Sequence, residues 1–181
     1  MKLTPPTHAP VVHLNDCTGH PVEVGTGRRT LLAFFRDTSC PFCNLRVYEL
    51  TQMHEELAAA GLEIVAVFSS TPDEVLKFVR QRPRPFRVAA DPRNEAYRIY
   101  GVRHSVAGKL RAVFNRLGDW LAGMHAAGWS RSLRGLAGLN TNNLLPADFL
   151  IDENGRIVEA YYGGDAGDHI PLDRILRFAR A

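Results

Sequence analysis

The sequence lacks the features that mark membrane, fibrous and disulfide-rich proteins. Its 181 residues include three cysteines, and no apolar run approaches the roughly 20 residues of a membrane span. The N-terminal residues include prolines and a histidine where a secretory signal has its apolar segment, so we expect a cytoplasmic protein. Internal repeats and low-complexity tracts are also absent. The chain therefore falls in none of these special classes.

The excess of positive over negative charge is small as well. The net charge of +3 is too small to indicate nucleic-acid binding by itself. Hydrophobic residues make up 45% and charged residues 23%, which is the composition of a globular protein. A chain of this length predicts one domain, 1–181, with a core that needs no disulfides.

The three cysteines are Cys17, Cys40 and Cys43. An odd number in a chain without a signal sequence argues against a structural disulfide framework. Cys40 and Cys43 form a Cys-x-x-Cys motif, which calls for a chemical explanation. Cys17 falls in an expected hairpin loop and has no assigned role.

Apolar periodicity and turn residues predict an order of elements along the chain. They are a hairpin of 11–14 and 21–24, a strand 30–35, a helix 41–60, a strand 62–68, a helix from 72, a strand 86–89, a helix 91–100, a hairpin of 147–151 and 156–162, and a helix from 171. Strands that alternate with helices indicate an α/β fold, a parallel sheet with helices on both faces. The closing hairpin adds antiparallel strands, so the expected sheet is mixed.

The motif falls where a buried strand ends and a helix begins. Ligand sites of parallel sheets lie at this edge, and a helix N-terminus stabilises a thiolate. We therefore expect Cys40 to be the low-pKa nucleophile. Cys43, one helical turn later, is placed to resolve the intermediate.

Two less reactive interpretations of the motif remain open. A structural zinc site would need two further ligands, and the candidates are Cys17, His13 and His20. The pair could also be buried, inert cysteines. We expect neither a metal nor a bound cofactor.

The segment 33–43 resembles the active-site segment of the thioredoxin superfamily, and more closely the peroxiredoxin-like branch of the AhpC/TSA redoxins. The segment 145–158 resembles the second hallmark of that branch, and Asp91-Pro92 before Tyr97 and Tyr100 fits too. The resemblance covers nearly the whole chain except about 102–143. It implies a thioredoxin-like fold and redox chemistry.

The resemblance also implies a substrate site. Pro146 is expected to form a cis peptide facing the cysteines, with the Leu145 backbone pairing to a disulfide substrate. Typical peroxiredoxins carry Pro-x-x-x-Thr-x-x-Cys, but here Asp37 holds the threonine position and Thr38 is one residue off. Pro146 also stands where they carry an arginine, so Arg36 is the nearby candidate for positive charge. These departures favour disulfide exchange over fast peroxide reduction.

The insertion at 102–143 is the least explained segment. Apolar residues at three- and four-residue spacing predict an amphipathic helix; they are Val106, Leu110, Val113, Leu117, Trp120, Leu121 and Met124. Six basic residues accompany one acid, Asp119; they are Arg103, Lys109, Arg111, Arg116, Arg131 and Arg134. The helix could pack on the domain with a solvated basic face, form a lid or a homodimer contact near the site, or bind a membrane surface.

Three functions follow from the sequence. The first is a thiol–disulfide oxidoreductase, in which Cys40 attacks, Cys43 resolves, and Arg36, Thr38, Leu145 and Pro146 bind substrate. Electrons would come from an external dithiol or a thioredoxin-type reductant. The second is a thiol peroxidase that reduces hydroperoxides. The third is a non-enzymatic redox sensor in which the Cys40–Cys43 disulfide switches the contacts of the insertion.

Overall fold

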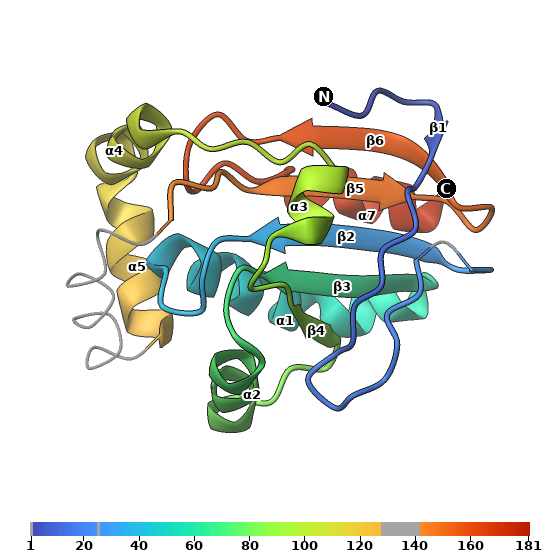
Figure 1. Ribbon diagram of the computed structural model, residues 1–181, viewed down its shortest axis with the longest axis horizontal. Coiled ribbons are helices and arrows are strands. Elements are labelled where there is room, and N and C mark those ends of the chain that lie inside the picture. Colours follow the sequence, from blue (N-terminus) through green and yellow to red (C-terminus); the bar gives the residue numbers. More distant parts are fainter. Residues whose placement is uncertain (1, 25, 128–141) are drawn as a thin grey trace.

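A six-stranded sheet with the order β1-β6-β5-β2-β3-β4 forms the centre of the molecule (Figure 1). The computed structural model describes residues 2–24, 26–127 and 142–181. The strands are β1 (Thr7–His8), β2 (Arg29–Phe35), β3 (Leu62–Phe68), β4 (Arg87–Ala90), β5 (Ala147–Ile151) and β6 (Arg156–Tyr162). Strands β2, β3 and β4 are parallel, and β5, β6 and β1 join antiparallel. The predicted mixed sheet is confirmed.

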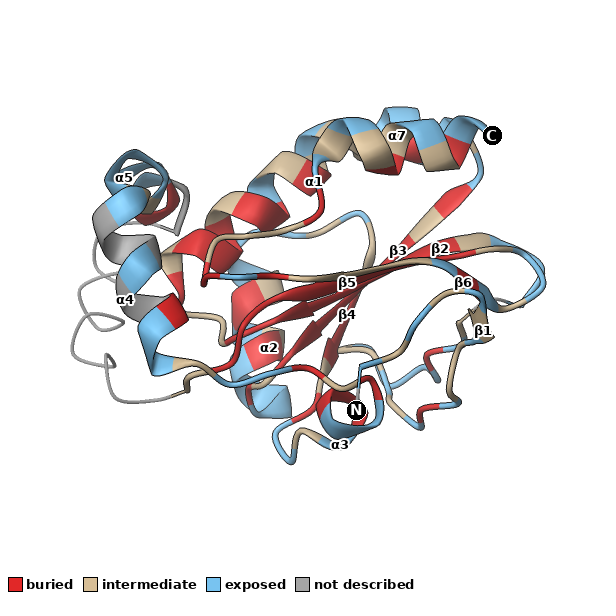
Figure 2. Ribbon diagram, turned by 90° about the horizontal axis from the view of Figure 1, so that it is seen from above, coloured by how far each residue is buried: buried red, intermediate tan, exposed pale blue. Residues whose placement is uncertain are grey.

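Both faces of the sheet are covered, as the continuous apolar strands require. Alternate residues of β2 enter opposite cores: Leu31 and Phe35 one, Leu32 and Phe34 the other. Helices α1 (Pro41–Ala59) and α7 (Leu172–Arg180) lie on the first face, and α3 (Glu95–Ile99) lies on the second (Figure 2). Helix α2 (Pro72–Gln81) completes the first core through Val75 and Phe78.

Helix α1 begins where the sequence predicts. Pro41 occupies the first turn, and Cys40 is the N-cap residue with extended backbone. Gly61, with φ of +81°, follows the last turn and adopts the left-handed conformation that glycine tolerates. The chain thus leaves the buried strand β2 and enters a long helix across five residues, 36–40.

Outside the insertion, two predicted elements differ from the structure. The N-terminal hairpin is reduced to a turn closed by one isolated bridge, Asn15 to Pro21. Helix α3 begins at Glu95 because both Asp91 carboxylate oxygens accept backbone N–H groups there, from Glu95 and Ala96 at 3.0 and 2.8 Å. The expected start at 91 was therefore four residues early.

The insertion forms two helices rather than one, α4 (Val106–Asn115) and α5 (Leu117–Ala127). Its predicted apolar face is only partly correct, because Val106, Leu117 and Leu121 are 57%, 55% and 46% exposed while Met124 is buried. The side chains of Leu110 and Val113, and residues Arg131 and Arg134, lie outside the described residues. Two glycines, Gly108 and Gly123, instead take up buried positions.

Among the described helices, none combines the length and the apolar character needed to cross a membrane.

The buried hydroxyl of Tyr97 lets the contribution of one core hydrogen-bonding group to stability be measured. It donates to the carbonyl oxygens of Phe35 and Val67, at 2.5 and 2.8 Å, at the ends of β2 and β3. We expect Tyr97→Phe to lower the free energy of unfolding by about 1–3 kcal/mol, because buried carbonyls lose their donor. Urea unfolding measures this. Tyr48→Phe is the control, since Tyr48 is exposed; equal losses in both variants would contradict the assignment.

Candidate active site

Cys40 and Cys43 lie together at the C-terminal end of β2, where the loop 36–40 enters α1. Both are free thiols in this structure. Cys40 is 4% exposed and Cys43 is fully buried. The two side chains lie near enough for each to shift the pKa of the other. The structure therefore brings together the two cysteines that the motif singled out.

Arg36 is the charged partner of this pair. Its Nη1 lies 3.8 Å from the Cys40 sulfur, and its backbone N–H donates to the Cys43 sulfur at 3.4 Å. The residue is 7% exposed, so the guanidinium charge acts with little solvent screening. The predicted positive charge beside Cys40 is present.

The surroundings push the two thiol pKa values apart. The hydrogen bond from the Cys43 thiol and the positive charge of Arg36 together lower the pKa of Cys40, although burial opposes them. Burial raises the pKa of Cys43 well above its ordinary value, and the hydrogen bond to Cys40 adds to this. The first sulfur is the better thiolate and the second stays protonated.

Asn44 holds the loop in place, and sequence reasoning missed it. The side chain is 2% exposed, and its Nδ2 donates to the carbonyl oxygens of Thr38 and Cys40 at 3.0 and 2.8 Å. Its Oδ1 has no hydrogen-bond partner among the described residues. The sequence signal that could have identified it is a polar residue directly after Cys43. Its position four residues after Cys40 lets an amide side chain reach the Cys40 carbonyl.

Thr38 takes part in the loop through its backbone. Its N–H donates to the Ser70 hydroxyl oxygen at 3.2 Å, and its carbonyl accepts from Asn44. The neighbouring Ser39 N–H donates to the Asp37 carboxylate at 3.0 Å. These contacts fix the path of the chain into Cys40.

The expectation for Leu145 and Pro146 needs a correction. The cis peptide bond among the described residues is Pro5–Pro6, so the prediction of a cis Leu145–Pro146 bond is wrong. The Leu145 N–H, expected to face substrate, donates instead to the Arg103 carbonyl at 2.8 Å. Because the Leu145 N–H is already hydrogen-bonded within the chain, this backbone does not need a cis bond that would turn it toward a substrate.

A second buried charge cluster lies under the loop 165–171. Asp148 of β5 pairs with His169, with 3.0 Å between Oδ2 and Nδ1, and also accepts the Ile170 N–H at 2.7 Å. Burial raises the pKa of Asp148, but the charge and hydrogen bond of His169, followed by Arg46, hold it below its usual value. The carboxylate thus ties this loop to the sheet.

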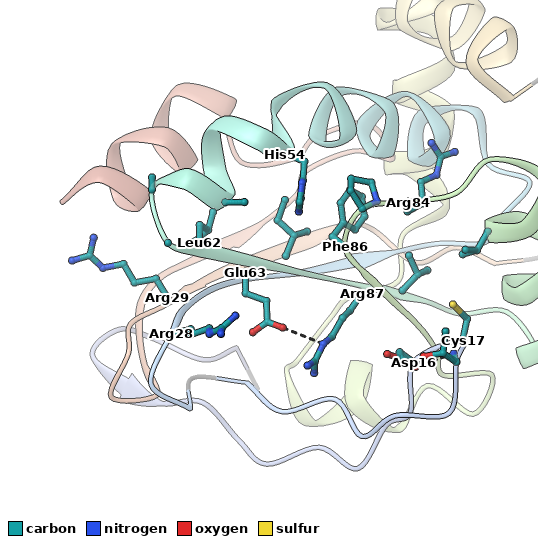
Figure 3. A pocket seen from close by; sticks show the side chains of 18 of the residues that line it. Asp16, Cys17, Arg28, Arg29, His54, Leu62, Glu63, Arg84, Phe86 and Arg87 are labelled. Carbon is teal, nitrogen blue, oxygen red and sulfur yellow. Dashed lines mark hydrogen bonds and ion pairs between the residues drawn. The ribbon is translucent and has the colours of Figure 1, made fainter.

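A cavity of about 950 Å³ lies away from the cysteine pair, which does not line it (Figure 3). It runs along β4 and the start of β3, where Arg87 pairs with Glu63 at 3.1 Å. Cys17 lines it, and burial and Asp16 raise the pKa of this thiol. Cys17 therefore lies apart from the site and is a poor nucleophile.

No group of three or more His, Cys, Asp or Glu side chains in the described parts of the chain is placed to hold a metal ion.

The Asp148 cluster predicts how stability depends on pH. Because the pKa of Asp148 is depressed in the folded state, its stabilisation is present above about pH 4, the ordinary range of aspartate, and is lost as pH falls below it. We expect Asp148→Asn to cost about 3–5 kcal/mol at pH 7 and less in acid. Urea unfolding from pH 7 to 3 measures this. The exposed Asp73→Asn is the control, and a pH-independent loss would contradict the prediction.

The charge beside Cys40 predicts the reactivity of the two thiols. Site-resolved iodoacetamide labelling against pH should modify Cys40 before Cys43, and Arg36→Gln should move the Cys40 midpoint to higher pH, because the thiolate loses its cation. Arg28→Gln removes the same charge from an exposed position and should leave the midpoint unchanged. Faster labelling of Cys43, or equal midpoints in the two variants, would refute the electrostatic account.

Comparison with known proteins agrees with this geometry. A Mycobacterium tuberculosis protein that carries the name of a peroxiredoxin is 23% identical over 171 residues, covering 93% of this chain and 91% of the relative. Among solved structures, a Chlorobium tepidum protein that carries the name of a thiol:disulfide interchange protein DsbE is 25% identical with a TM-score of 0.65, covering 99% of this chain and 100% of that one. Peroxidoxin BcpB of M. tuberculosis is 15% identical with a TM-score of 0.66, covering 97% and 95%. The AhpC/TSA family profile matches residues 5–160, and the chain belongs to this family of thioredoxin-like oxidoreductases.

Proposed function

We propose that the protein is a thiol–disulfide oxidoreductase in which Cys40 attacks and Cys43 resolves. The observation that carries the proposal is the placement of the two thiols. Cys40 is the N-cap residue of α1 with its sulfur 3.8 Å from the buried Arg36 guanidinium, which lowers its pKa, while Cys43 lies buried in the first turn of the helix, where burial raises its pKa. Disulfide exchange needs a thiolate that attacks the substrate and a neighbouring thiol that resolves the mixed disulfide.

The proposed reaction balances without a bound cofactor. The Cys40 thiolate attacks one sulfur of the substrate disulfide, the substrate S–S bond breaks, and the leaving thiolate takes a proton. Cys43 then loses its proton and attacks the Cys40 sulfur, which releases the second substrate thiol. Two electrons pass from the dithiol to the substrate, and an external dithiol or thioredoxin-type reductant restores the pair.

The remaining residues receive roles within this proposal. Arg36 stabilises thiolate character at Cys40, and Thr38 shapes the loop that presents it. Leu145 and Pro146 lie just before β5, next to the end of β2, and their backbone groups pair with Arg103 and Gly163 instead of forming an open edge. The likeness to a thiol:disulfide interchange protein supports this activity. A cytoplasmic location and a homodimer through the insertion remain part of the proposal.

Hydroperoxide reduction is the second candidate, favoured by the peroxiredoxin names of two relatives. The Cys40 thiolate would attack the terminal peroxide oxygen, the O–O bond would break, and an alcohol would leave with a proton. Cys43 would then attack the sulfenic acid and release water. Arg36 is the cation near enough to stabilise the developing charge, but Asp37 and Pro146 replace the two groups typical of fast peroxidases.

Trapping distinguishes the roles of the two cysteines. We expect Cys43→Ser to accumulate mixed disulfides through Cys40, because the intermediate cannot collapse to the internal disulfide. Cys40→Ser should accumulate none, and Cys17→Ser is the control that should behave like the parent. Mass spectrometry after reaction with a small aromatic disulfide reads the adducts. Equal yields from Cys43→Ser and Cys40→Ser would contradict the assignment.

Peroxide kinetics distinguish the two enzymatic candidates. Losing one preorganised donor typically costs roughly a hundredfold in rate, so two replaced groups predict a slow peroxidase. Stopped-flow oxidation of the reduced protein by hydrogen peroxide should give a second-order constant below about 10⁵ M⁻¹s⁻¹. A faster reaction would place the peroxidase first. Turnover of neither peroxide nor disulfides would favour the redox sensor.

A further inference from the structure

Helix α5 of the insertion is seated directly on the start of α1. A side-chain carbon added at Gly123 would lie 2.2 Å from the Pro41 carbonyl oxygen and 2.6 Å from its carbon. No residue larger than glycine fits this contact without moving the helix. Since Pro41 follows Cys40, α5 packs against the first turn of α1 directly after Cys40, and Figure 1 shows the two helices side by side there.

The start of the insertion occupies the backbone edge next to the site. His104 and Leu144 form an antiparallel bridge. Leu145 donates its N–H to the Arg103 carbonyl at 2.8 Å, and Ser105 donates to Asn143 at 2.6 Å. The chain's own segment 103–105 therefore pairs where an extended peptide substrate would add as a strand.

Two further contacts hold the insertion against the site. The Arg36 Nη2, on the residue that contacts Cys40, donates to the Asn142 carbonyl at 2.9 Å. Arg116, between α4 and α5, pairs with Asp165 at 3.2 Å and with Asp168 at 3.8 Å. The C-terminal end of the insertion is thus fastened to the cysteine site, and the turn between α4 and α5 is fastened to the loop 165–168.

We propose that α5 and the segment 103–105 form a size filter, which restricts Cys40 to small disulfides and excludes disulfides of folded proteins. This rests on the proposed function and specifies its substrate class. A disulfide in a folded protein brings its flanking backbone to the nucleophile, and here α5 and the segment 103–105 fill that space. A small disulfide needs access to one sulfur only. The same filter favours a small dithiol over a protein as the reductant.

Unpaired polar atoms beside the cysteines suit a small polar substrate. Arg36 Nε and Asn44 Oδ1 are buried, and neither has a hydrogen-bond partner among the described residues. Within the described part of the chain, the Arg36 Nε–H is a free donor and the Asn44 Oδ1 a free acceptor, and both residues contact Cys40 through other atoms. Buried polar groups without partners are costly, so a polar ligand that pairs with them gains affinity.

Gly123 provides the direct test. Reduced protein is mixed with 4,4′-dithiodipyridine, a small aromatic disulfide, and separately with insulin as a protein disulfide, and both rates are measured. We expect Gly123→Ala to raise the insulin rate about tenfold or more, because overpacking displaces α5 from Pro41. The small-disulfide rate should change less than about threefold. Gly118→Ala, on the same helix with no atom within 4 Å, is the matched control and should change neither rate.

A second variant loosens the insertion without touching Pro41. Arg116→Gln removes the pairing to Asp165 and Asp168 and should also raise the insulin rate. Arg111→Gln removes an equal charge from an exposed position of α4 and should not. Circular dichroism checks that each variant is folded. If Gly123→Ala is unfolded, this pair of arginine variants decides the question.

Different outcomes of these experiments test the size filter and the proposed oxidoreductase function. A parent protein that reduces insulin as fast as the small disulfide overturns the filter and leaves the oxidoreductase standing. Equal insulin rates for Gly123→Ala and Gly118→Ala, or for the two arginine variants, also overturn it. Failure of every variant to react with either disulfide overturns the proposed function itself.

Discussion

The burial of the Arg36 guanidinium against the Cys40 sulfur is the interaction on which the site depends. A charge removed from water is costly unless it is paired and hydrogen-bonded. Here the Cys40 sulfur, the Asn142 carbonyl and the nearby thiol of Cys43 surround it. Burial alone would lower the pKa of Arg36, but the charges of Cys40, Cys43 and Asp37 raise it, so the guanidinium stays positively charged beside the Cys40 sulfur.

The same residue couples the chemistry to the insertion. One guanidinium nitrogen contacts the Cys40 sulfur, and another donates to the carbonyl of Asn142 at the end of the insertion. Arg36 thus connects the Cys40 sulfur to the backbone of Asn142 through one side chain.

The rest of the fold serves to hold this arrangement steady. Strand β2 is central in the sheet and buried on both faces, so the point at which the chain leaves it is well fixed. Tyr97 ties the ends of β2 and β3, and Asp148 fastens the loop that lies against Phe42. Burial raises the pKa of Cys43, so this thiol stays protonated while Cys40 carries the thiolate. In the proposed reaction this difference makes Cys40 attack first and Cys43 second.

The sequence alone determined the local features of this protein. Apolar runs, Pro41 and Gly61 located β2, α1 and β3, and the Cys-x-x-Cys motif located the chemistry, because these signals act within a few residues. Only the tertiary structure decided that Leu145–Pro146 is trans, that Arg103 takes the Leu145 N–H, and that Gly123 is the contact face of α5. Glycine carries no hydrophobic signal, and its role depends on how closely another backbone approaches. That distance is set by the packing of segments about eighty residues apart, which no local pattern encodes.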